Sequence, residues 1–319
     1  MRVLVTGGFG FLGGRIATYL GHRNCSIILG TRSSFDAPSW LLEADVIKMN
    51  WDDTSALERC CRDVDVVVHA AGMNAKECEE SPANALLCNG VFTARLMNAA
   101  RSAGVSKFIF LSTVHVYARP LVGMLDEDTP AKNLHPYSTS NIAGENAVLA
   151  AHKPGTMQSI VLRLSNAFGA PMCKKVNCWM LLVNELCRQA VQTRNLALTG
   201  GGEQLRDFIP ISDVCHIIDA FVNGENDDLH SGVFNIGSGK ALSVLSMAKI
   251  IQERCINILG FRPKIKCQFK AEKMDPLPLS YTSNRLNQTN LKLRHGDINE
   301  EIDHLIRFCN RNFRADSVG

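Results

Sequence analysis

The chain of 319 residues is 46% hydrophobic and 20% charged, enough to bury a sizeable core and to form a main domain with a smaller one. Its net charge of +3 indicates neither nucleic acid nor a membrane surface as a partner. The twelve cysteines are scattered without zinc spacing, so we expect no metal site, free thiols and a reduced, cytoplasmic setting.

Short apolar runs alternate with helical patterns through the first half of the chain. Runs rich in Val and Ile predict buried strands, and they occupy residues 3–5, 27–29, 66–69 and 108–111. Apolar residues at helical spacing lie between them, at 10–20 and 89–100. This order predicts an α/β fold of the Rossmann type, a doubly wound parallel sheet covered by helices on both faces.

A glycine-rich segment follows the first predicted strand directly and opens the first helix. It reads Thr6-Gly7-Gly8-Phe9-Gly10-Phe11-Leu12-Gly13. In a strand-turn-helix context, Gly7 permits a tight turn, Gly10 lets the backbone approach a pyrophosphate, and Gly13 allows close helix packing. The segment therefore predicts a dinucleotide site.

The end of the second strand bears on the choice of cofactor. NAD-selective sites place an acidic residue there to hold the ribose hydroxyls, but this chain has no Asp or Glu before Asp36. The strand ends in Gly30-Thr31-Arg32, whose cation can receive a 2′-phosphate. The sequence thus favours NADP(H) and leaves NAD(H) open; the alternative is that Arg32 is a solvated surface residue.

Beyond residue 165 the pattern loosens into loops and helices, with helices expected at 180–191, 244–258 and 298–310. We expect residues 1–165 to form the NAD(P)-binding domain and residues 166–319 to form mainly a smaller, substrate-binding lobe. Segments near 208–214 and 233–239 have strand-and-turn patterns. We expect both to return to the first domain, so that the two lobes are interleaved in sequence.

Further motifs occur in a fixed order: His69-Ala70-Ala71-Gly72, Leu111 to Tyr117, Tyr137 to Asn141, Arg163 to Gly169, and Arg206-Asp207-Phe208. Together with the glycine segment, they resemble the extended short-chain dehydrogenase/reductases, also called the NAD-dependent epimerase/dehydratase family, of the type that modifies nucleotide sugars. The resemblance runs from residue 2 to about residue 310.

The resemblance implies roles for individual residues. Asn50 and Trp51 match the adenine contacts, Ala70 and Ala71 the backbone beside the cofactor, and Asn89 the start of the following helix.

In the catalytic motifs, Tyr137 matches the residue that exchanges a proton with the substrate, and Thr113 matches the hydroxyl that holds the same oxygen. In the second lobe, Arg206 matches a diphosphate-binding arginine and Asn166 a residue that hydrogen-bonds the same substrate.

Asn141 departs from the family, which has a lysine four residues after the catalytic tyrosine. An asparagine brings no positive charge to favour tyrosinate. Either redox chemistry is slow, or a lysine from elsewhere substitutes, or the protein binds ligands without turning them over. The missing lysine charge slows proton donation by Tyr137 less than proton abstraction, because the neutral phenol is already in the acid form.

A second departure follows Thr113. The family's 4,6-dehydratases carry Asp-Glu there, and this chain has Val114 and His115, so we expect no 4,6-dehydration. Related epimerases place a Cys at the position of His115 and a Lys or His near that of Lys175. An imidazole titrates near neutrality and can move such a proton; the alternatives are a hydrogen-bonded His115 in the cleft wall and a solvated Lys175.

These observations predict an NADP(H)-dependent enzyme that acts on a nucleoside-diphosphate sugar as a 4-keto reductase or an epimerase. The alternative is a catalytically weakened family member that binds NADP(H) as a sensor or scaffold. The helices expected at 89–100 and 141–151 match those that pair across a two-fold axis in many relatives, which predicts a homodimer.

Overall fold

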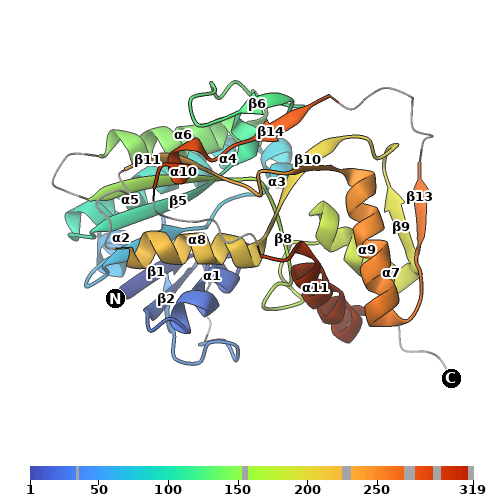
Figure 1. Cartoon of the computed structure of the whole chain (residues 1–319). Helices are drawn as coiled ribbons and strands as arrows, with labels where there is room; N and C mark the ends of the chain where they lie inside the picture. Colours follow the sequence, from blue (N-terminus) through green and yellow to red (C-terminus); the bar gives the residue numbers. More distant parts are fainter. Residues whose placement is uncertain (34–35, 153–156, 225–230, 269–276, 290–295, 315–319) are drawn as a thin grey trace.

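The main lobe of the computed structural model is built on a seven-stranded, fully parallel sheet (Figure 1). The structure describes the whole chain except residues 34–35, 153–156, 225–230, 269–276, 290–295 and 315–319. The strand order is β11-β7-β5-β4-β1-β2-β3. Their bounds are β1 Arg2–Thr6, β2 Ser26–Thr31, β3 Asp45–Lys48, β4 Val66–His69, β5 Lys107–Thr113, β7 Gln158–Leu164 and β11 Gly232–Ile236. The predicted doubly wound sheet is confirmed.

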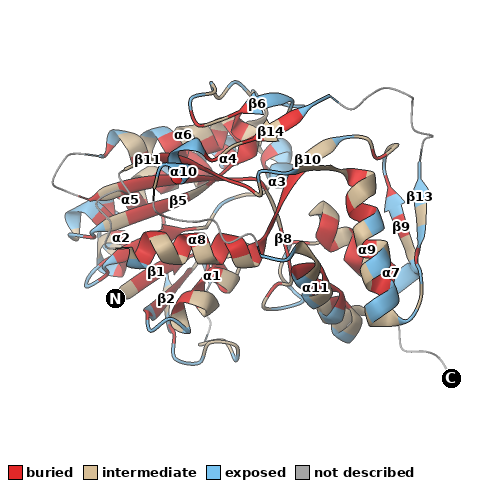
Figure 2. Cartoon of the chain, in the orientation of Figure 1, coloured by how far each residue is buried: buried red, intermediate tan, exposed pale blue. Residues whose placement is uncertain are grey.

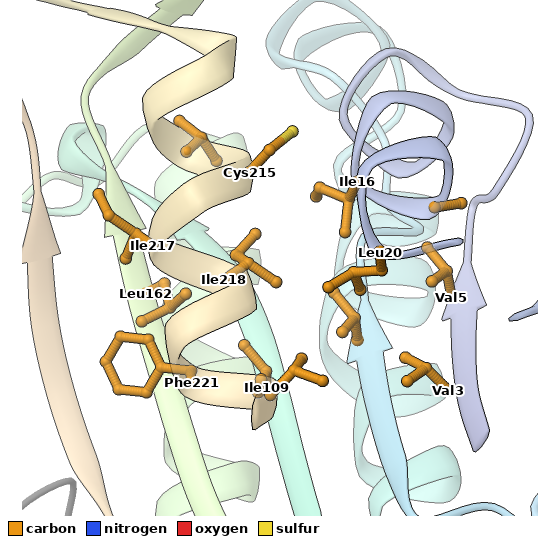
Figure 3. Close-up of a cluster of buried hydrophobic side chains, with 14 of the residues drawn as sticks. Val3, Val5, Ile16, Leu20, Ile109, Leu162, Cys215, Ile217, Ile218 and Phe221 are labelled. Carbon is orange, nitrogen blue, oxygen red and sulfur yellow. The ribbon is translucent and has the colours of Figure 1, made fainter. Parts of the chain in front are cut away.

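Helices cover both faces of this sheet. One face packs against α1 (Phe11–Gly21) and α8 (Ile211–Asn223), and the other against α2 (Thr54–Cys60), α5 (Phe92–Ser102) and α6 (Pro136–Ala150). Figure 3 shows the first face, where Ile16 and Leu20 of α1 lie opposite Ile218 of α8 above the strands. Each such fully buried side chain stabilises the fold by about 1.5–3 kcal/mol.

The second lobe has a core of its own, formed mainly by α7 (Leu182–Thr193), α9 (Val244–Leu259) and α11 (Ile298–Phe313). Its strands form two small sheets, β12-β10-β8 and β13-β9. The bounds are β8 Asn166–Phe168, β9 Asn195–Leu198, β10 Leu205–Pro210, β12 Ala241–Ser243 and β13 Lys264–Cys267. Figure 2 shows the buried faces of these helices turned toward one another.

The chain returns to the main sheet in one of the two expected places as a strand. The segment near 233–239 contains β11, which pairs with β7. The expectation for 208–214 needs correction, because β10 pairs with β8 and β12 in the second lobe. The segment returns to the main lobe by packing, because Ile209 of β10 and Ile211 and Val214 of α8 belong to the core on the main sheet.

Short elements connect these parts. They are α3 Ala75–Glu80, α4 Pro82–Ala85, a π-helical turn η1 Leu86–Val91, a 3₁₀ turn η2 Val114–Val116, the paired strands β6 Gly123–Leu125 and β14 Leu279–Tyr281, and α10 Asn284–Asn287. The helix expected at 89–100 is therefore the end of η1 followed by α5. The helix expected at 141–151 is α6, which begins five residues earlier because Pro136 occupies its first turn.

A partly buried ion pair joins the two lobes beside the glycine segment. Arg15 of α1 contacts Glu301 of α11 across 3.0 Å and also donates to the Ala170 carbonyl. Within the described ranges, the helices are all too short or too polar to traverse a bilayer.

Candidate active site

The glycine segment packs against itself and against the backbone after β4 so tightly that Gly7 and Gly13 have no room for side chains. Gly7 has φ +65°, and a Cβ on it would lie 2.9 Å from the Ala71 nitrogen. A Cβ on Gly13 would lie 2.2 Å from the Gly7 carbonyl oxygen. No side chain caps the start of α1, whose N-cap is Gly10, so its first N–H groups point toward the space that a pyrophosphate would fill. This geometry fits a bound dinucleotide.

The end of β2 forms the far wall of this cleft. A Cβ at Gly30 would lie 2.6 Å from the Met49 sulfur, so a methionine fills the direction in which an acid would extend. Arg32 is exposed and lines the cleft. Trp51 also lines it, stacked on Phe92 with ring centroids 5.5 Å apart. Asn50 is exposed and lies outside the cleft, so the structure does not bring it to the adenine side.

A buried histidine fixes the backbone that follows β4. The Thr93 hydroxyl donates to the Asn89 carbonyl (2.7 Å) and so accepts from His69 Nε2 (3.0 Å). The other ring nitrogen, Nδ1, then accepts from the Thr6 hydroxyl (2.7 Å), which accepts from the Ala71 N–H (3.2 Å). Burial lowers the pKa of His69 to about 3, consistent with a neutral ring in this chain of bonds.

Thr113 and Tyr137 meet at the carboxyl end of β5. A hydrogen bond from Thr113 lowers the pKa of Tyr137, but burial has the larger effect and raises it above 10. The phenol therefore stays protonated at neutral pH. Thr113 also accepts the His115 N–H at 3.2 Å, which holds its hydroxyl at the start of η2.

Asn141 lies one helical turn after Tyr137 on α6 and lines the same cavity. Its Nδ2 donates to the Tyr137 backbone carbonyl at 2.7 Å. This bond ties the amide nitrogen to the helix and leaves the amide oxygen as the group that can accept a hydrogen bond from a ligand. Among the described side chains, no cation is one of the causes that shift the pKa of Tyr137, although Lys76 lines the same cavity.

A buried ion pair supports this centre from behind. Glu145 of α6 contacts Arg163 of β7 at 2.6 Å and accepts from the hydroxyl of Ser112, the neighbour of Thr113. Arg163 also donates to the Tyr117 hydroxyl at 2.9 Å. The pair therefore connects the helix that carries Tyr137 with the strand that carries Thr113.

Two cavities share the wall between the lobes. The cofactor cleft has a volume of about 520 Å³ and contains the glycine segment, Arg32, Trp51 and Ala70 to Asn74. The second, the substrate cavity, has a volume of about 540 Å³. Its lining includes Ala70, Ala71, Asn89, Thr113, His115, Tyr137, Asn141, Asn166 and Arg206. Lys175 is exposed and lines neither cavity, so the structure does not bring it to His115.

His115 and Arg206 lie close together in the substrate cavity. Burial lowers the pKa of His115 to about 4, and the charges of Arg206, Arg119 and His135 add to the effect. At neutral pH the imidazole is therefore unprotonated, and its low pKa makes it a weak base. Burial also lowers the pKa of Arg206, whose guanidinium donates to Gln204 at 3.0 Å.

The sequence patterns missed the roles of two residues of the site. Lys76 lines the substrate cavity, and His69 holds Thr6 and Thr93. His69 stands in the quoted motif, but only its burial reveals the role of the ring. In the described part of the chain, no three His, Cys, Asp or Glu side chains are grouped so that they could hold a metal ion.

Comparisons with known proteins agree with this geometry. Residues 3–237 match the NAD dependent epimerase/dehydratase family. A putative UDP-glucose 4-epimerase of Methanocaldococcus jannaschii is 27% identical over 268 residues, which cover 82% of this chain and 83% of that protein. A dTDP-glucose 4,6-dehydratase of Streptomyces niveus is 25% identical over 269 residues, covering 80% and 78%.

Among solved structures, MoeE5 in complex with UDP-glucose and NAD has a TM-score of 0.78 and 25% identity, covering 98% of this chain and 99% of that one. The class defined by the fold and site is a Rossmann-type, dinucleotide-binding enzyme. The chain belongs to the NAD dependent epimerase/dehydratase family. The predicted family and enzyme class are thereby confirmed.

Proposed function

We propose that this protein is an NADP(H)-dependent oxidoreductase or isomerase that acts on a nucleoside-diphosphate sugar, as a 4-keto reductase or an epimerase. One observation carries the proposal. A single cavity contains the Thr113–Tyr137 pair, borders the glycine segment at Phe11 and Leu12, and reaches Arg206 of the second lobe. A substrate bound there can be held by its diphosphate while its sugar contacts Tyr137.

The roles of the chain's own residues follow from their protonation. A bound nicotinamide dinucleotide supplies or accepts a hydride. Neutral Tyr137 donates a proton to the substrate oxygen, which Thr113 holds by its hydroxyl. His115 is neutral at pH 7, but its pKa of about 4 makes it a weak base, so Tyr137 is the group that exchanges the proton. Val114 is buried and has no proton to exchange.

The choice of NADP(H) over NAD(H) rests on the end of β2. The cleft has Arg32 at its rim and a methionine where an acid would extend from Gly30. The matching family is described as NAD dependent, and the solved structure of MoeE5 contains NAD. NAD(H) is therefore the alternative cofactor.

A second candidate function is that of a sensor or scaffold that binds NADP(H) without turnover. Asn141 supports it, because the amide is bonded to its own helix and brings no charge to Tyr137. The two candidates differ in turnover, which a panel of nucleotide sugars and 4-keto sugars with NADPH or NADH measures directly. Cofactor binding without any turnover would contradict the enzyme and support the sensor.

The substrate assignment has its own test in Arg206→Ala. Losing a charge-assisted hydrogen bond of about 1.5–3 kcal/mol should raise the Kd of the nucleotide sugar about tenfold or more and leave the Kd of the cofactor unchanged. Lys175→Ala, on an exposed side chain outside the cavity, is the matched control. An unaltered substrate Kd in Arg206→Ala would refute the diphosphate role.

We further propose that the chain forms a homodimer through the face of η1, α5 and α6. The turn η1 exposes three apolar side chains, Leu86, Leu87 and Val91, at 48%, 38% and 44%. A group of exposed apolar side chains is typical of a surface that another protein covers. Light scattering of the unaltered protein and of Leu87→Glu tests whether the chain forms this dimer.

The cysteines bear on the cellular compartment of the protein. All twelve are free thiols and nine are buried, which supports our proposal of a reduced, cytoplasmic compartment.

A further inference from the structure

A third cavity opens beside the substrate cavity, on the side of Tyr137. This chamber has a volume of about 320 Å³. It shares six lining residues with the substrate cavity: Ala75, Lys76, His115, Tyr137, Asn166 and Arg206. Because Tyr137 lines both, a sugar whose reacting carbon contacts the tyrosine can extend its other substituents into the chamber.

The chamber is rich in positive charge. Lys76, Arg119 and Arg206 line it, and Glu79 is the single carboxylate among its described lining residues. Neither Arg119 nor Arg206 has an ion pair with any described side chain, whereas Lys76 has a distant one, 3.8 Å from Glu80 at the surface. Two arginines without a carboxylate partner make a site that favours an anion.

His135 adds a neutral donor to the chamber. Its Nδ1 accepts the Tyr137 N–H at 3.2 Å, as the N-cap of α6. The proton of the neutral ring is therefore on Nε2. Tyr137 and Glu79 aside, the ionisable side chains of the chamber are hydrogen-bond donors or bases. A ligand that only accepts hydrogen bonds, such as a carboxylate, matches them.

The positive charges converge on one place. Burial depresses the pKa of His115 most, and the charges of Arg206 and Arg119 add to the effect. Arg206 comes from β10 of the second lobe and Arg119 from the loop after η2 in the main lobe. The fold therefore brings cations of both lobes to the same end of the sugar site.

We propose that this chamber binds a second anionic group of the substrate, the carboxylate of a nucleoside-diphosphate uronic acid, through Lys76, Arg119 and His135. The inference rests on the proposed function and makes its substrate class narrower. Arg206 lies at the boundary with the second lobe and is left for the diphosphate. Lys76, Arg119 and His135 belong to the main lobe, beyond Tyr137, where the far side of the sugar would lie. A neutral hexose would leave these donors without a charged partner.

The experiment compares ligands that differ only at carbon 6 of the sugar. The Kd of UDP-glucuronic acid and of UDP-glucose is measured with NADP⁺ present, for the unaltered protein and for the double variant Lys76→Met/Arg119→Met. Glucuronic acid 1-phosphate and glucose 1-phosphate repeat the comparison without a base. Lys175→Met is the control, and melting temperature and cofactor Kd report the fold of each variant.

We expect the unaltered protein and the Lys175→Met control to bind the uronic acid at least about tenfold more tightly than the hexose. The double variant should lose this preference while its Kd for the neutral sugar stays within about twofold. High salt should reduce the preference, because both residues are exposed.

Three results would overturn the inference. Equal affinity for the two sugars in the unaltered protein would show that the chamber does not select a carboxylate. Equal weakening of both sugars in the double variant would show that Lys76 and Arg119 hold the diphosphate instead. Binding of the cofactor without binding of any of the four ligands would refute the proposed function as well.

Discussion

The cofactor cleft depends on tight backbone packing within one local unit, whereas the substrate cavity brings together side chains that both lobes contribute. In the cleft, Gly7 and Gly13 lie within one strand-turn-helix unit, where a side chain on either glycine would collide with neighbouring backbone. In the cavity, Thr113, Tyr137 and Arg206 come from β5, α6 and β10. The difference implies that damage to the cleft affects cofactor binding and stability together, while changes in the cavity affect turnover or substrate alone.

The largest effect is expected at Tyr137, in the cavity. Tyr137→Phe removes the proton donor and should lower the rate of the proposed reaction by about 10²–10⁴. The Kd of the cofactor, measured by fluorescence titration, should not change. Full activity in this variant would show that another group carries the proton.

In the cleft, Gly13→Ala should impair folding and cofactor binding together. Its new Cβ would lie 2.2 Å from the Gly7 carbonyl oxygen, and the loop must move at a cost of about 1–3 kcal/mol. We expect a lower melting temperature and a cofactor Kd raised about tenfold or more. Gly14→Ala is the matched control, since its nearest described atoms, Gly8 O and Met172 Cγ, are both 3.3 Å away. Equal effects of the two substitutions would contradict the assignment.

Low pH should lower the stability of the folded protein through His69, which holds Thr6 and Thr93 beside the cofactor cleft. Its folded-state pKa of about 3 lies below the ordinary 6.5, so the unfolded chain takes up a proton first as the pH falls. This contribution to stability is complete above pH 6.5 and is lost toward pH 3, by about 1.4 kcal/mol per pH unit within that window.

Urea unfolding between pH 7 and pH 4.5 measures this slope. The variant His69→Gln lacks the titrating group and should show a flatter dependence of the free energy of unfolding on pH. The same slope in both proteins would mean that other groups cause the acid sensitivity.

A smaller effect is expected at the rim of the cleft. Arg32→Glu should weaken NADPH about tenfold relative to NADH, because it replaces the cation proposed for the 2′-phosphate with an anion. Arg62→Glu changes an exposed arginine that lines neither the cofactor cleft nor the substrate cavity and should leave the ratio unchanged. Equal affinities for NADPH and NADH in the unaltered protein would contradict the preference.

The smallest effect is expected at Asn141. Asn141→Lys restores a cation near Tyr137 and should lower the pKa of the phenol, shifting the pH profile of the oxidative direction down by about one unit. Asn141→Met has a similar length without the charge and should produce no such shift. If both variants shift the pH profile equally, the missing lysine charge is not what determines the pKa of Tyr137.

The sequence by itself determined the Rossmann unit and its glycine segment, because both are local. Gly7 to Gly13 follow β1 directly and open α1, so spacing alone predicts the cleft. The sequence also predicted the buried strands β1, β2, β4 and β5. Both faces of a parallel sheet are covered, so the residues of each strand form a continuously apolar run. The short β3, with charged residues at both ends, was missed.

Tertiary structure alone decided which distant side chains meet. It paired β10 with β8 and β12 instead of the main sheet, and it left Asn50 and Lys175 exposed outside the cavities. It also brought Lys76, Arg119 and His135 into one chamber, although no motif connects them. A motif records the local backbone conformation, whereas such meetings depend on how the lobes pack, and packing is the sum of many contacts that no short segment contains.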